Sequence, residues 1–261
     1  MKNHYLFYNP AGFLTLFFKE MRRFVKVSVQ TIVAPLLSNI LYLIIFGEML
    51  RARSTEISGT SFLLYIVPGL VEMGAIFAAF MNPASSISSQ KYQKTIQDMN
   101  SYPISNIEKA LAFILGGTFR GLLIGILTYA AAGFFVGFTI EFPILFWGMI
   151  MVTSFVFAAV GLICGLLSKN NEILTFFLSI VITPLVYLGG VFFEISSLPG
   201  PLTYIRYINP VYPLVNIARY AYLGNAEGNI LIQSIAVSII SVFCLWIATY
   251  CIKKGYGVKV M

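Results

Sequence analysis

Six apolar runs divide the chain, and polar or proline-rich intervals separate them. The runs lie at about 31–50, 62–81, 110–136, 144–167, 173–193 and 230–252. A helix of about 20 residues is about 30 Å long and crosses the hydrocarbon core of a bilayer once. The pattern therefore predicts an all-α integral membrane protein with six transmembrane helices, which form a single domain over residues 1–261.

The first 30 residues have a helical period that is typical of an amphipathic helix. Over residues 11–28, Phe13, Phe17, Met21 and Phe24 fall on one face. The segment also carries four cations, and most of them fall on the opposite face: Lys19, Arg22, Arg23 and Lys26. Such a helix suits the headgroup plane of a membrane, so we expect an interfacial helix here. The alternative is an extension of the first span.

The interval 194–229 is too polar to span a membrane and too apolar to be a free loop. Four prolines break it into short pieces: Pro199, Pro201, Pro210 and Pro213. Its Tyr and Arg residues suit a membrane interface. We expect one or two short helices that re-enter the membrane from the extracytoplasmic side. An ordinary folded loop is the alternative.

The interval 83–109 is the longest polar stretch between two apolar runs. Within it, Tyr92, Ile96 and Met99 recur at positions i, i+4 and i+7, and Tyr102-Pro103 ends the pattern. This spacing predicts a short amphipathic helix. Its apolar face needs a partner, which could be the membrane interface, the N-terminal helix or a groove in another protein.

The distribution of Lys and Arg predicts the orientation. Of the 17 Lys and Arg residues, 12 lie in the N-terminal segment, the 83–109 interval, the 168–172 link and the C-terminal tail. Four lie in the intervals on the other side, and Arg120 lies inside a span. Because cytoplasmic loops carry an excess of cations, we expect both termini and the 83–109 interval in the cytoplasm.

Composition supports the membrane assignment and argues against nucleic-acid binding. Hydrophobic residues make up 58% of the chain, charged residues make up 10%, and the mean hydropathy is +0.85. The net charge of +7 comes from cations at the ends of apolar runs, which is the membrane-orientation pattern. The three cysteines lie in apolar runs without metal-site spacing, so we expect them to be buried as small hydrophobic residues.

The sequence lacks the motifs that enzymes use. There is no G-x-x-x-x-G-K-[ST] phosphate loop, no G-x-S-x-G nucleophile motif, and no cluster of His, Cys and carboxylates with metal spacing. We therefore expect no catalysis by this chain, no catalytic residues and no metal.

Two charges lie deep in predicted spans, Glu72 in the second and Arg120 in the third. Each is about ten residues from a span end, which puts both near mid-membrane at 1.5 Å per residue. A charge at that depth is costly unless it is paired or hydrated. The two could form a stabilising ion pair, or Arg120 could bind helix-end carbonyls. An ion-coupled secondary transporter that uses both residues is the alternative reading.

Glycines and prolines predict how the spans pack and bend. Gly117, Gly121 and Gly125 form a ladder of small residues that lets helix backbones approach closely. Pro68-Gly69 and Pro184 predict kinks or breaks in the second and fifth spans.

Several short stretches resemble the permease (transmembrane) subunits of type 2 ATP-binding-cassette (ABC-2) exporters, in particular the bacterial YadH-like branch. The resemblance covers essentially the whole chain, and order and spacing carry it rather than any one piece. It begins with VQTIVAPLL at 29–37 and IVPGL at 66–70, and it includes Gly116-Gly117 and Arg120-Gly121. The most specific residues are Pro68, Gly69, Pro184, Gly189, Gly190, Phe192, Phe193, Asn209 and Pro210.

The resemblance implies six spans with an interfacial helix and a re-entrant segment before the last span. It also implies a homodimer whose two copies each bind a separate ATPase subunit, where ATP and magnesium would bind. The family's coupling helix would correspond to about 86–103. Coupling to the ATPase would then involve Tyr92, Thr95, Ile96, Met99, Tyr102 and Pro103. The chain departs from many relatives at Gln97, where a glutamate is expected, and at Glu72.

By the same resemblance, the chain would export its substrate from the cytoplasm or the inner leaflet of a bacterial inner membrane. Spans one, two and five would line a largely apolar and aromatic path. Such a path favours an amphiphilic or hydrophobic substrate: a drug, a lipid or a lipid-linked glycan. A membrane lipid is an expected partner, and nucleic acid is not.

Overall fold

The computed structural model describes residues 9–26, 32–51, 56–57, 60–225 and 227–256. Within these ranges the chain is helical almost throughout, and a two-stranded antiparallel hairpin joins β1 (Glu56–Ile57) to β2 (Thr60–Ser61). Residues 27–31 and 226 lie outside the described residues, so the end of the predicted interfacial helix and the start of the predicted first span are not described.

The helices follow the predicted apolar runs closely. The long ones are α1 (Pro10–Lys26), α2 (Ala34–Arg51), α3 (Phe62–Tyr92), α5 (Asn106–Val136), α6 (Pro143–Leu167), α10 (Val211–Leu223) and α11 (Ile230–Lys254). The short ones are α4 (Asp98–Ser101), α7 (Asn171–Phe177), α8 (Thr183–Val186) and α9 (Ile205–Ile208). Widened π-helical turns form η2 (Leu178–Ile182) and η3 (Tyr187–Val191), and tight 3-10 turns form η4 (Ile195–Ser197) and η5 (Gly200–Tyr204).

Five helices in the described part of the chain are long and apolar enough to cross a membrane: α3, α5, α6, the continuous run from α7 to η3, and α11. The apolar part of α2, Ala34–Ile45, is shorter. The structure is therefore that of an all-α, multi-pass membrane protein.

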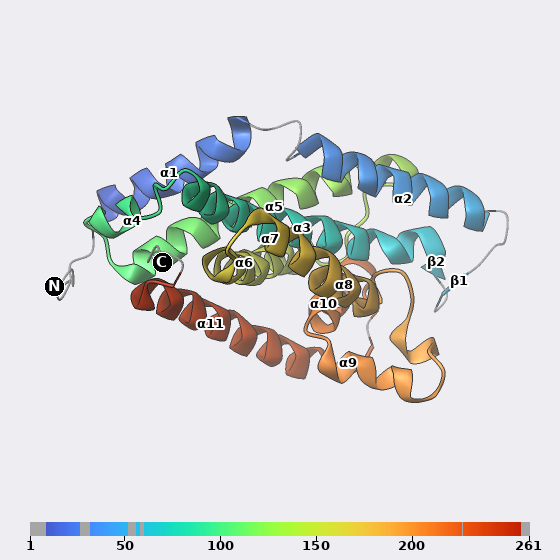
Figure 1. Cartoon of the computed structure of the whole chain (residues 1–261). Coiled ribbons are helices and arrows are strands. Elements are labelled where there is room, and N and C mark those ends of the chain that lie inside the picture. The colour runs from blue at the N-terminus through green and yellow to red at the C-terminus, as the bar shows by residue number, and fades with distance from the viewer. Residues whose placement is uncertain (1–8, 27–31, 52–55, 58–59, 226, 257–261) are drawn as a thin grey trace.

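The α3 helix is the centre of the bundle, and α5 and α6 pack along it (Figure 1). In its most apolar 18-residue window, 78% of the residues are buried inside the chain. The predicted glycine ladder packs here, since a Cβ on Gly117 would lie 2.9 Å from the carbonyl oxygen of Ala79. Only glycines permit this approach of α5 to α3.

The second span is not broken at Pro68-Gly69, which was one of the two outcomes predicted there. The α3 helix continues through both Pro68 and Pro83 to Tyr92, about ten residues beyond the predicted end of the span. Prolines are tolerated in such helices when close neighbours compensate for the lost backbone hydrogen bond. The tight packing of α5 and α6 along α3 supplies those neighbours.

The fifth span is distorted around Pro184, as predicted. The helix widens into η2 before this proline and into η3 after it, and π-helical turns of this kind are a known source of helix bending. One residue before the end of the run lies Gly190, whose φ of 81° is in the left-handed region that glycine adopts readily.

The 194–229 interval contains the expected short helices. Its first part forms η4, η5 and α9, while α10 is buried against α3, α6 and α11. Two backbone hydrogen bonds join α10 to the turn before α6, from the amides of Glu141 and Phe142 to the carbonyls of Tyr222 and Ala221.

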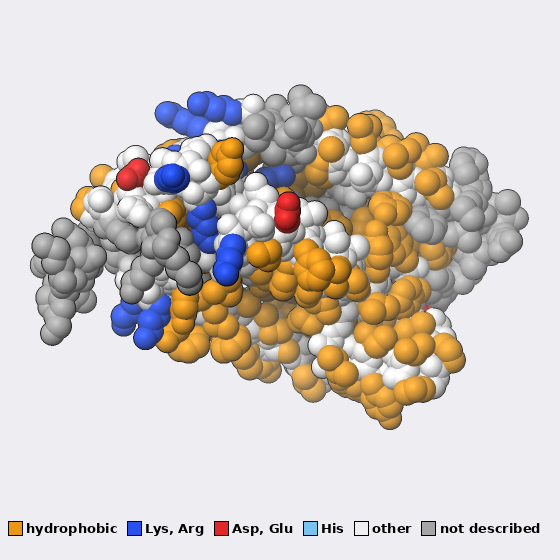
Figure 2. Space-filling model, in the orientation of Figure 1, with side chains coloured by type: hydrophobic (Ala, Val, Ile, Leu, Met, Phe, Trp, Pro, Cys, Tyr) orange, Lys and Arg blue, Asp and Glu red, His pale blue; other side chains and the backbone are white. Residues whose placement is uncertain are grey.

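The bundle has two chemically different ends. Figure 1 shows that α1 begins, α4 lies and α11 ends at one end, called here the α4 end. The β-hairpin and α9 lie at the opposite end, called the α9 end. Lys and Arg side chains gather towards the α4 end, and hydrophobic side chains cover the rest of the visible face (Figure 2).

Candidate functional site

The 83–109 interval does not form the short helix predicted over Tyr92, Ile96 and Met99. The α3 helix ends in a tight turn at Lys94, whose φ of 58° is left-handed, and the amide of Thr95 then donates to the carbonyl of Gln90. Between that turn and the start of α5, only the four residues of α4 are helical. The interval therefore consists of the end of α3, this turn, α4, a loop and the start of α5.

The apolar residues of this interval pack inside their own chain. Ile96 is 2% exposed and Met99 is 1% exposed, whereas Tyr92 is 88% exposed. The three side chains therefore share no face, and an external partner cannot contact Ile96 or Met99 directly. Ile96 and Met99 belong to the hydrophobic core of the chain.

Polar side chains on the same interval remain exposed at the α4 end. We call them the handle surface: Tyr92, Gln93, Lys94, Thr95, Gln97 and Asp98. Pro103 is also exposed, and Tyr102 is half-buried beside α1, where Lys19 donates to its hydroxyl at 3.4 Å. Of the predicted coupling residues, Tyr92, Thr95 and Pro103 are thus accessible.

Lys91 anchors the end of α3 to the end of α6, and sequence reasoning gave it no role. Its ammonium donates to the carbonyls of Gly165, Leu166 and Ser168 at 2.9, 2.7 and 2.6 Å. These carbonyls lie where the last turn of α6 leaves acceptors unsatisfied, and a cation there also complements the helix dipole. We call this arrangement the Lys91 clamp. It holds the handle surface in a fixed position on α3 and α6.

The start of α1 is tied to the start of α5. Ser105 and Glu108 form a reciprocal capping box at the first turn of α5. Glu108 also accepts from the amide of Asn9 at 2.8 Å, and the Asn9 side chain donates to the carbonyl of Pro103. One carboxylate therefore joins α1, the loop and α5.

A buried polar cluster joins the second half of α1 to α3, and we call it the α1 latch. Glu20 is fully buried and accepts from Ser86 at 2.8 Å and from Arg23 at 3.1 Å. Arg23 also donates to the carbonyl and the side chain of Asn82, at 2.6 and 2.9 Å, and to Ser85. Arg23 was predicted to lie in the headgroup plane with the other cations, but its guanidinium turns inward.

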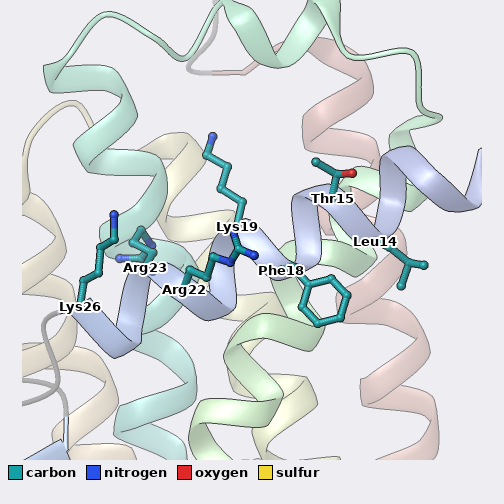
Figure 3. A pocket seen from close by; sticks show the side chains of 7 residues that line it. All are labelled: Leu14, Thr15, Phe18, Lys19, Arg22, Arg23 and Lys26. Atoms are coloured by element: carbon teal, nitrogen blue, oxygen red, sulfur yellow. The ribbon is translucent and has the colours of Figure 1, made fainter.

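The remaining predicted interfacial cations stay on the outer surface of α1. Lys19, Arg22 and Lys26 are exposed, and so are Leu14 and Phe18. They line a shallow open groove of about 690 Å3, in which Leu14 and Phe18 lie on one side of the helix and Lys19 on the other (Figure 3). The apolar face that the sequence predicted packs into the bundle instead, since Phe24 is buried and Phe13 and Phe17 pack against the core.

Glu72 and Arg120 do not form the ion pair that was considered possible. Among the described residues the one ion pair joins Glu20 to Arg23. Glu72 is fully buried on α3 near Thr153 of α6, while Arg120 lies on α5 close to Arg23 of α1.

At the α9 end, family-signature residues from three separate segments meet. Gly69 of α3 packs against the backbone of Val191, since a Cβ there would lie 2.7 Å from the Val191 carbonyl oxygen. The side chain of Asn209 donates to the carbonyl of Leu185 at 2.7 Å and caps the start of α10 by accepting from Val211. The signature therefore marks a packing junction of α3, the end of the fifth span and α10.

Arg219 is the centre of this junction, and the sequence gave no signal for it. Its guanidinium lies 3.9 Å from the ring centroid of Tyr65 and donates to the carbonyl of Gly190 at 2.5 Å. A buried arginine is stabilised by stacking on an aromatic ring and by a carbonyl acceptor at a left-handed glycine. Only the arrangement of three distant segments brings these partners together.

A hydrogen-bond network connects α10 to the start of α11. Asn216 donates to the carbonyl of Glu227 and to Gln233, at 2.7 and 2.8 Å, and Tyr212 donates to the Glu227 carboxylate at 3.3 Å. Burial and the nearby carboxylate of Glu194 raise the pKa of Glu227, against the opposing effect of Arg219. Burial likewise raises the pKa of Tyr222 to about 12.

The side chains described offer no site of metal-dependent chemistry. No group of three or more His, Cys, Asp and Glu residues that could hold a metal ion occurs within the described ranges. The arrangement instead combines a fixed polar surface at one end with a packed junction at the other.

The sequence is similar to those of several known proteins. Residues 11–223 match the family described as ABC-2 type transporter. The chain is 31% identical to inner membrane transport permease YadH of Escherichia coli K12 over 242 residues, which are 92% of this chain and 94% of that protein. It is also 23% identical to nodulation protein J of Rhizobium meliloti, with 77% of each chain covered, and 22% identical to that of Rhizobium leguminosarum, with 91% of each covered.

Proposed function

The chain belongs to the ABC-2 type transporter family, and we propose that it is the permease subunit of an exporter driven by a separate ATPase subunit. The relatives and the apolar helices agree with a multi-pass permease of a bacterial inner membrane. ATP and magnesium would bind to the partner, and this chain would supply the path through the membrane.

The handle surface is the observation that carries the coupling role. It is polar, it projects from the end of α3, and the Lys91 clamp and the α1 latch fix its base to α6 and α1. A rigid projection transmits force, whereas a flexible loop would absorb it. Motion of an ATPase bound here would therefore move α3, which is the central helix of the bundle.

The polar residues of the α1 latch suggest where on α3 the hydrocarbon core of the membrane begins. The 31 residues of α3 extend about 46 Å, which exceeds a hydrocarbon thickness of about 30 Å by about 16 Å. The α1 latch lies at Asn82, ten residues before Tyr92, so the segment beyond Asn82 would project into the cytoplasm. Six spans, with α2 as the first and α10 as the re-entrant segment, then complete the topology with both termini cytoplasmic.

A second copy of the chain would pair through α2 and the run from α7 to η3. In the apolar window of this run only 28% of the residues are buried inside the chain. Tyr42 of α2 and Tyr187 of η3 share a hydrogen bond of 2.9 Å between their hydroxyls, and both rings contact Phe192. The resulting apolar and aromatic face would line a path for an amphiphilic or hydrophobic substrate. The α3 helix, which was expected to line it, is instead buried in the bundle.

Affinity purification from native membranes in mild detergent tests the proposal. The tagged chain should bring down a stoichiometric soluble ATPase, which mass spectrometry identifies and an ATP hydrolysis assay confirms. A chain that is purified without an ATPase, yet moves solute across vesicles, would contradict the proposal.

Surface variants locate the contact. Replacing Tyr92, Gln97 and Asp98 together by alanine should reduce recovery of the ATPase at least about tenfold, because exposed contact residues are lost while the fold is kept. The matched control is Asn225→Ala, an exposed polar position at the α9 end. Equal recovery from both variants would place the ATPase contact elsewhere.

A further inference from the structure

A cavity of about 510 Å3 lies at the α9 end, between α9, the start of α10 and the first turns of α11. We call it the outer pocket. Figure 1 shows α9 beside the start of α11, at the end of the bundle opposite α1 and α4. The coupling surface lies at the other end, so the outer pocket is separate from it.

Two opposite charges line the outer pocket and do not pair with each other. Arg206 and Glu227 both line it, and no ion pair joins them within the described residues. The guanidinium of Arg206 lies 4.8 Å from the ring centroid of Tyr207, and its buried Nε has no hydrogen-bond partner in the described part of the chain. The terminal nitrogens of the guanidinium, rather than the buried Nε, are the donors that could reach a ligand.

Glu227 is held in place but retains hydrogen-bonding capacity. Its backbone is fixed by Asn216 and Gln233, and its carboxylate accepts from Tyr212. The backbone amide of Ser196 also donates to it. A carboxylate offers about four lone-pair sites, so these two donors leave room for another. The outer pocket therefore contains a negatively charged hydrogen-bond acceptor, Glu227, whose position is fixed. It also contains a positively charged hydrogen-bond donor, Arg206.

Three apolar side chains of α11 also line the outer pocket. Ile232, Ala236 and Ile240 of α11 lie in it at positions i, i+4 and i+8, so they form one stripe about 12 Å long. Beside the stripe, Ile235 and Ile239 are exposed. This stripe suits a hydrocarbon chain that runs along α11.

Exposed tyrosines beside Arg206 indicate that this part of the pocket lies at a membrane surface. Tyr204 and Tyr207 are exposed beside it, and exposed tyrosines concentrate where the headgroups of a bilayer begin. A ligand with its polar part between Arg206 and Glu227 and its apolar part along α11 would have the orientation of a lipid.

We propose that the outer pocket binds a zwitterionic phospholipid of the phosphatidylethanolamine class. Its phosphate contacts Arg206, its ammonium donates to Glu227, and one acyl chain follows Ile232, Ala236 and Ile240. The proposal needs only that the chain spans a membrane, so it can fail while the ATPase-driven function stands, and the reverse also holds.

Native mass spectrometry of the purified full-length chain tests the proposal. Phosphatidylethanolamine, phosphatidylcholine and phosphatidylglycerol with identical acyl chains are added singly to the unmodified chain and to Arg206→Gln and Glu227→Gln. The matched controls are Arg22→Gln and Glu172→Gln, which are exposed charges away from the outer pocket. Thermal unfolding without added lipid verifies that each variant is folded.

Glu227→Gln should change the affinities for the three lipids in different directions, whereas Arg206→Gln should lower all three. Arg206→Gln should weaken all three lipids about tenfold, because each loses a charge-assisted phosphate contact. Glu227→Gln should weaken phosphatidylethanolamine about fivefold, change phosphatidylcholine little because choline has no N–H donor, and strengthen phosphatidylglycerol by removing a repulsive charge. The control variants should change none of these affinities.

Other outcomes would overturn the proposal. If Arg206→Gln and Arg22→Gln had equal effects on lipid affinity, Arg206 would not bind the phosphate. If Glu227→Gln changed the affinities for phosphatidylethanolamine and phosphatidylglycerol in the same direction, Glu227 would not distinguish their headgroups. Displacement of bound lipid by an equal concentration of soluble phosphoethanolamine would show that the acyl chain contributes nothing. Ala236→Trp would fill the space beside Ile232 and Ile240 and should abolish binding of all three lipids. Unchanged binding would show that the lipid does not occupy the outer pocket.

Discussion

Glu72 has its carboxyl fully buried in the middle of α3, ten residues from Asn82 and ten from Phe62. No cation of the described chain forms an ion pair with it. An ionised carboxylate in such a place costs several kcal/mol, so a neutral carboxylic acid is the state that the surroundings favour. Its hydroxyl neighbour Thr153 is polar but uncharged.

This argument predicts the effect of Glu72→Gln. Because glutamine keeps the shape and polarity and carries no charge, the variant should insert, fold and transport as the unmodified chain does, within about 1 kcal/mol of stability. Unfolding in detergent and transport in vesicles measure the two effects.

Glu72→Ala is the comparison, because it leaves a cavity and should destabilise by about 1–3 kcal/mol. A Glu72→Gln variant that folds normally but transports nothing would require the charge itself. That result would favour the ion-coupled transporter over the ATPase-driven permease.

Arg120 illustrates how height along a helix changes the cost of a charge. Gly116 of α5 packs against Glu20 and Asn82 of the α1 latch, so Arg120 lies about one turn from that layer. Helical side chains lean towards the N-terminus, which in α5 is the α4 end. The guanidinium therefore extends towards the polar layer, and a partner in mid-membrane is not required.

At the scale of elements, the α1 latch makes α1 part of the bundle. Glu20→Ala should destabilise the protein by about 2–3 kcal/mol, because it leaves Arg23 without its carboxylate and Ser86 without its acceptor. Limited proteolysis should then cleave α1 faster, and unfolding in detergent should occur earlier.

The control for the latch is Lys26→Ala, which removes an exposed charge from the same helix. It should change stability by less than about 0.5 kcal/mol. If both variants behaved alike, the buried hydrogen bonds of Glu20 would contribute nothing to the docking of α1.

The Lys91 clamp is the second contact that fixes one element to another, since it joins the end of α3 to the end of α6. Lys91→Met should leave three carbonyls at the end of α6 without their donor and cost about 1–3 kcal/mol. Hydrogen exchange should accelerate at residues 165–168 and 93–99, and recovery of the ATPase should fall although the chain still inserts. Lys94→Met, an exposed lysine three residues away, should leave hydrogen exchange unchanged. Unaltered exchange in Lys91→Met would show that the clamp does not order the handle surface.

At the scale of the whole molecule, the two ends should face opposite sides of the membrane. In a background with Cys164, Cys244 and Cys251 replaced by alanine, single cysteines are introduced as Tyr92→Cys and Tyr207→Cys, since both positions are exposed. A membrane-impermeant thiol reagent should label Tyr207→Cys in intact cells. It should label Tyr92→Cys only after the inner membrane is opened, because cations at the α4 end favour the cytoplasm. Labelling of both positions in intact cells would contradict the proposed topology.

The sequence by itself determined which runs form helices long and apolar enough to cross a membrane. In hydrocarbon every backbone group must be satisfied within its own helix, so the length and polarity of a run decide whether it spans. This is why the runs at 110–136 and 144–167 correspond to α5 and α6 almost to the residue. The amphipathic period of α1, the distortion at Pro184 and the family signature were also readable, because they depend on neighbours in the sequence.

The tertiary structure alone decided which faces of these elements meet. Ile96 and Met99 became core residues and Arg23 turned inward, because burial depends on partners from segments far away in the sequence. Lys91 and Arg219 carried no local signal, since their acceptors are backbone carbonyls that any residue can supply. The relative heights of Glu72 and Arg120 followed from glycine contacts between helices. Such long-range registers are set by close packing, and packing is a property of the folded bundle rather than of any one run.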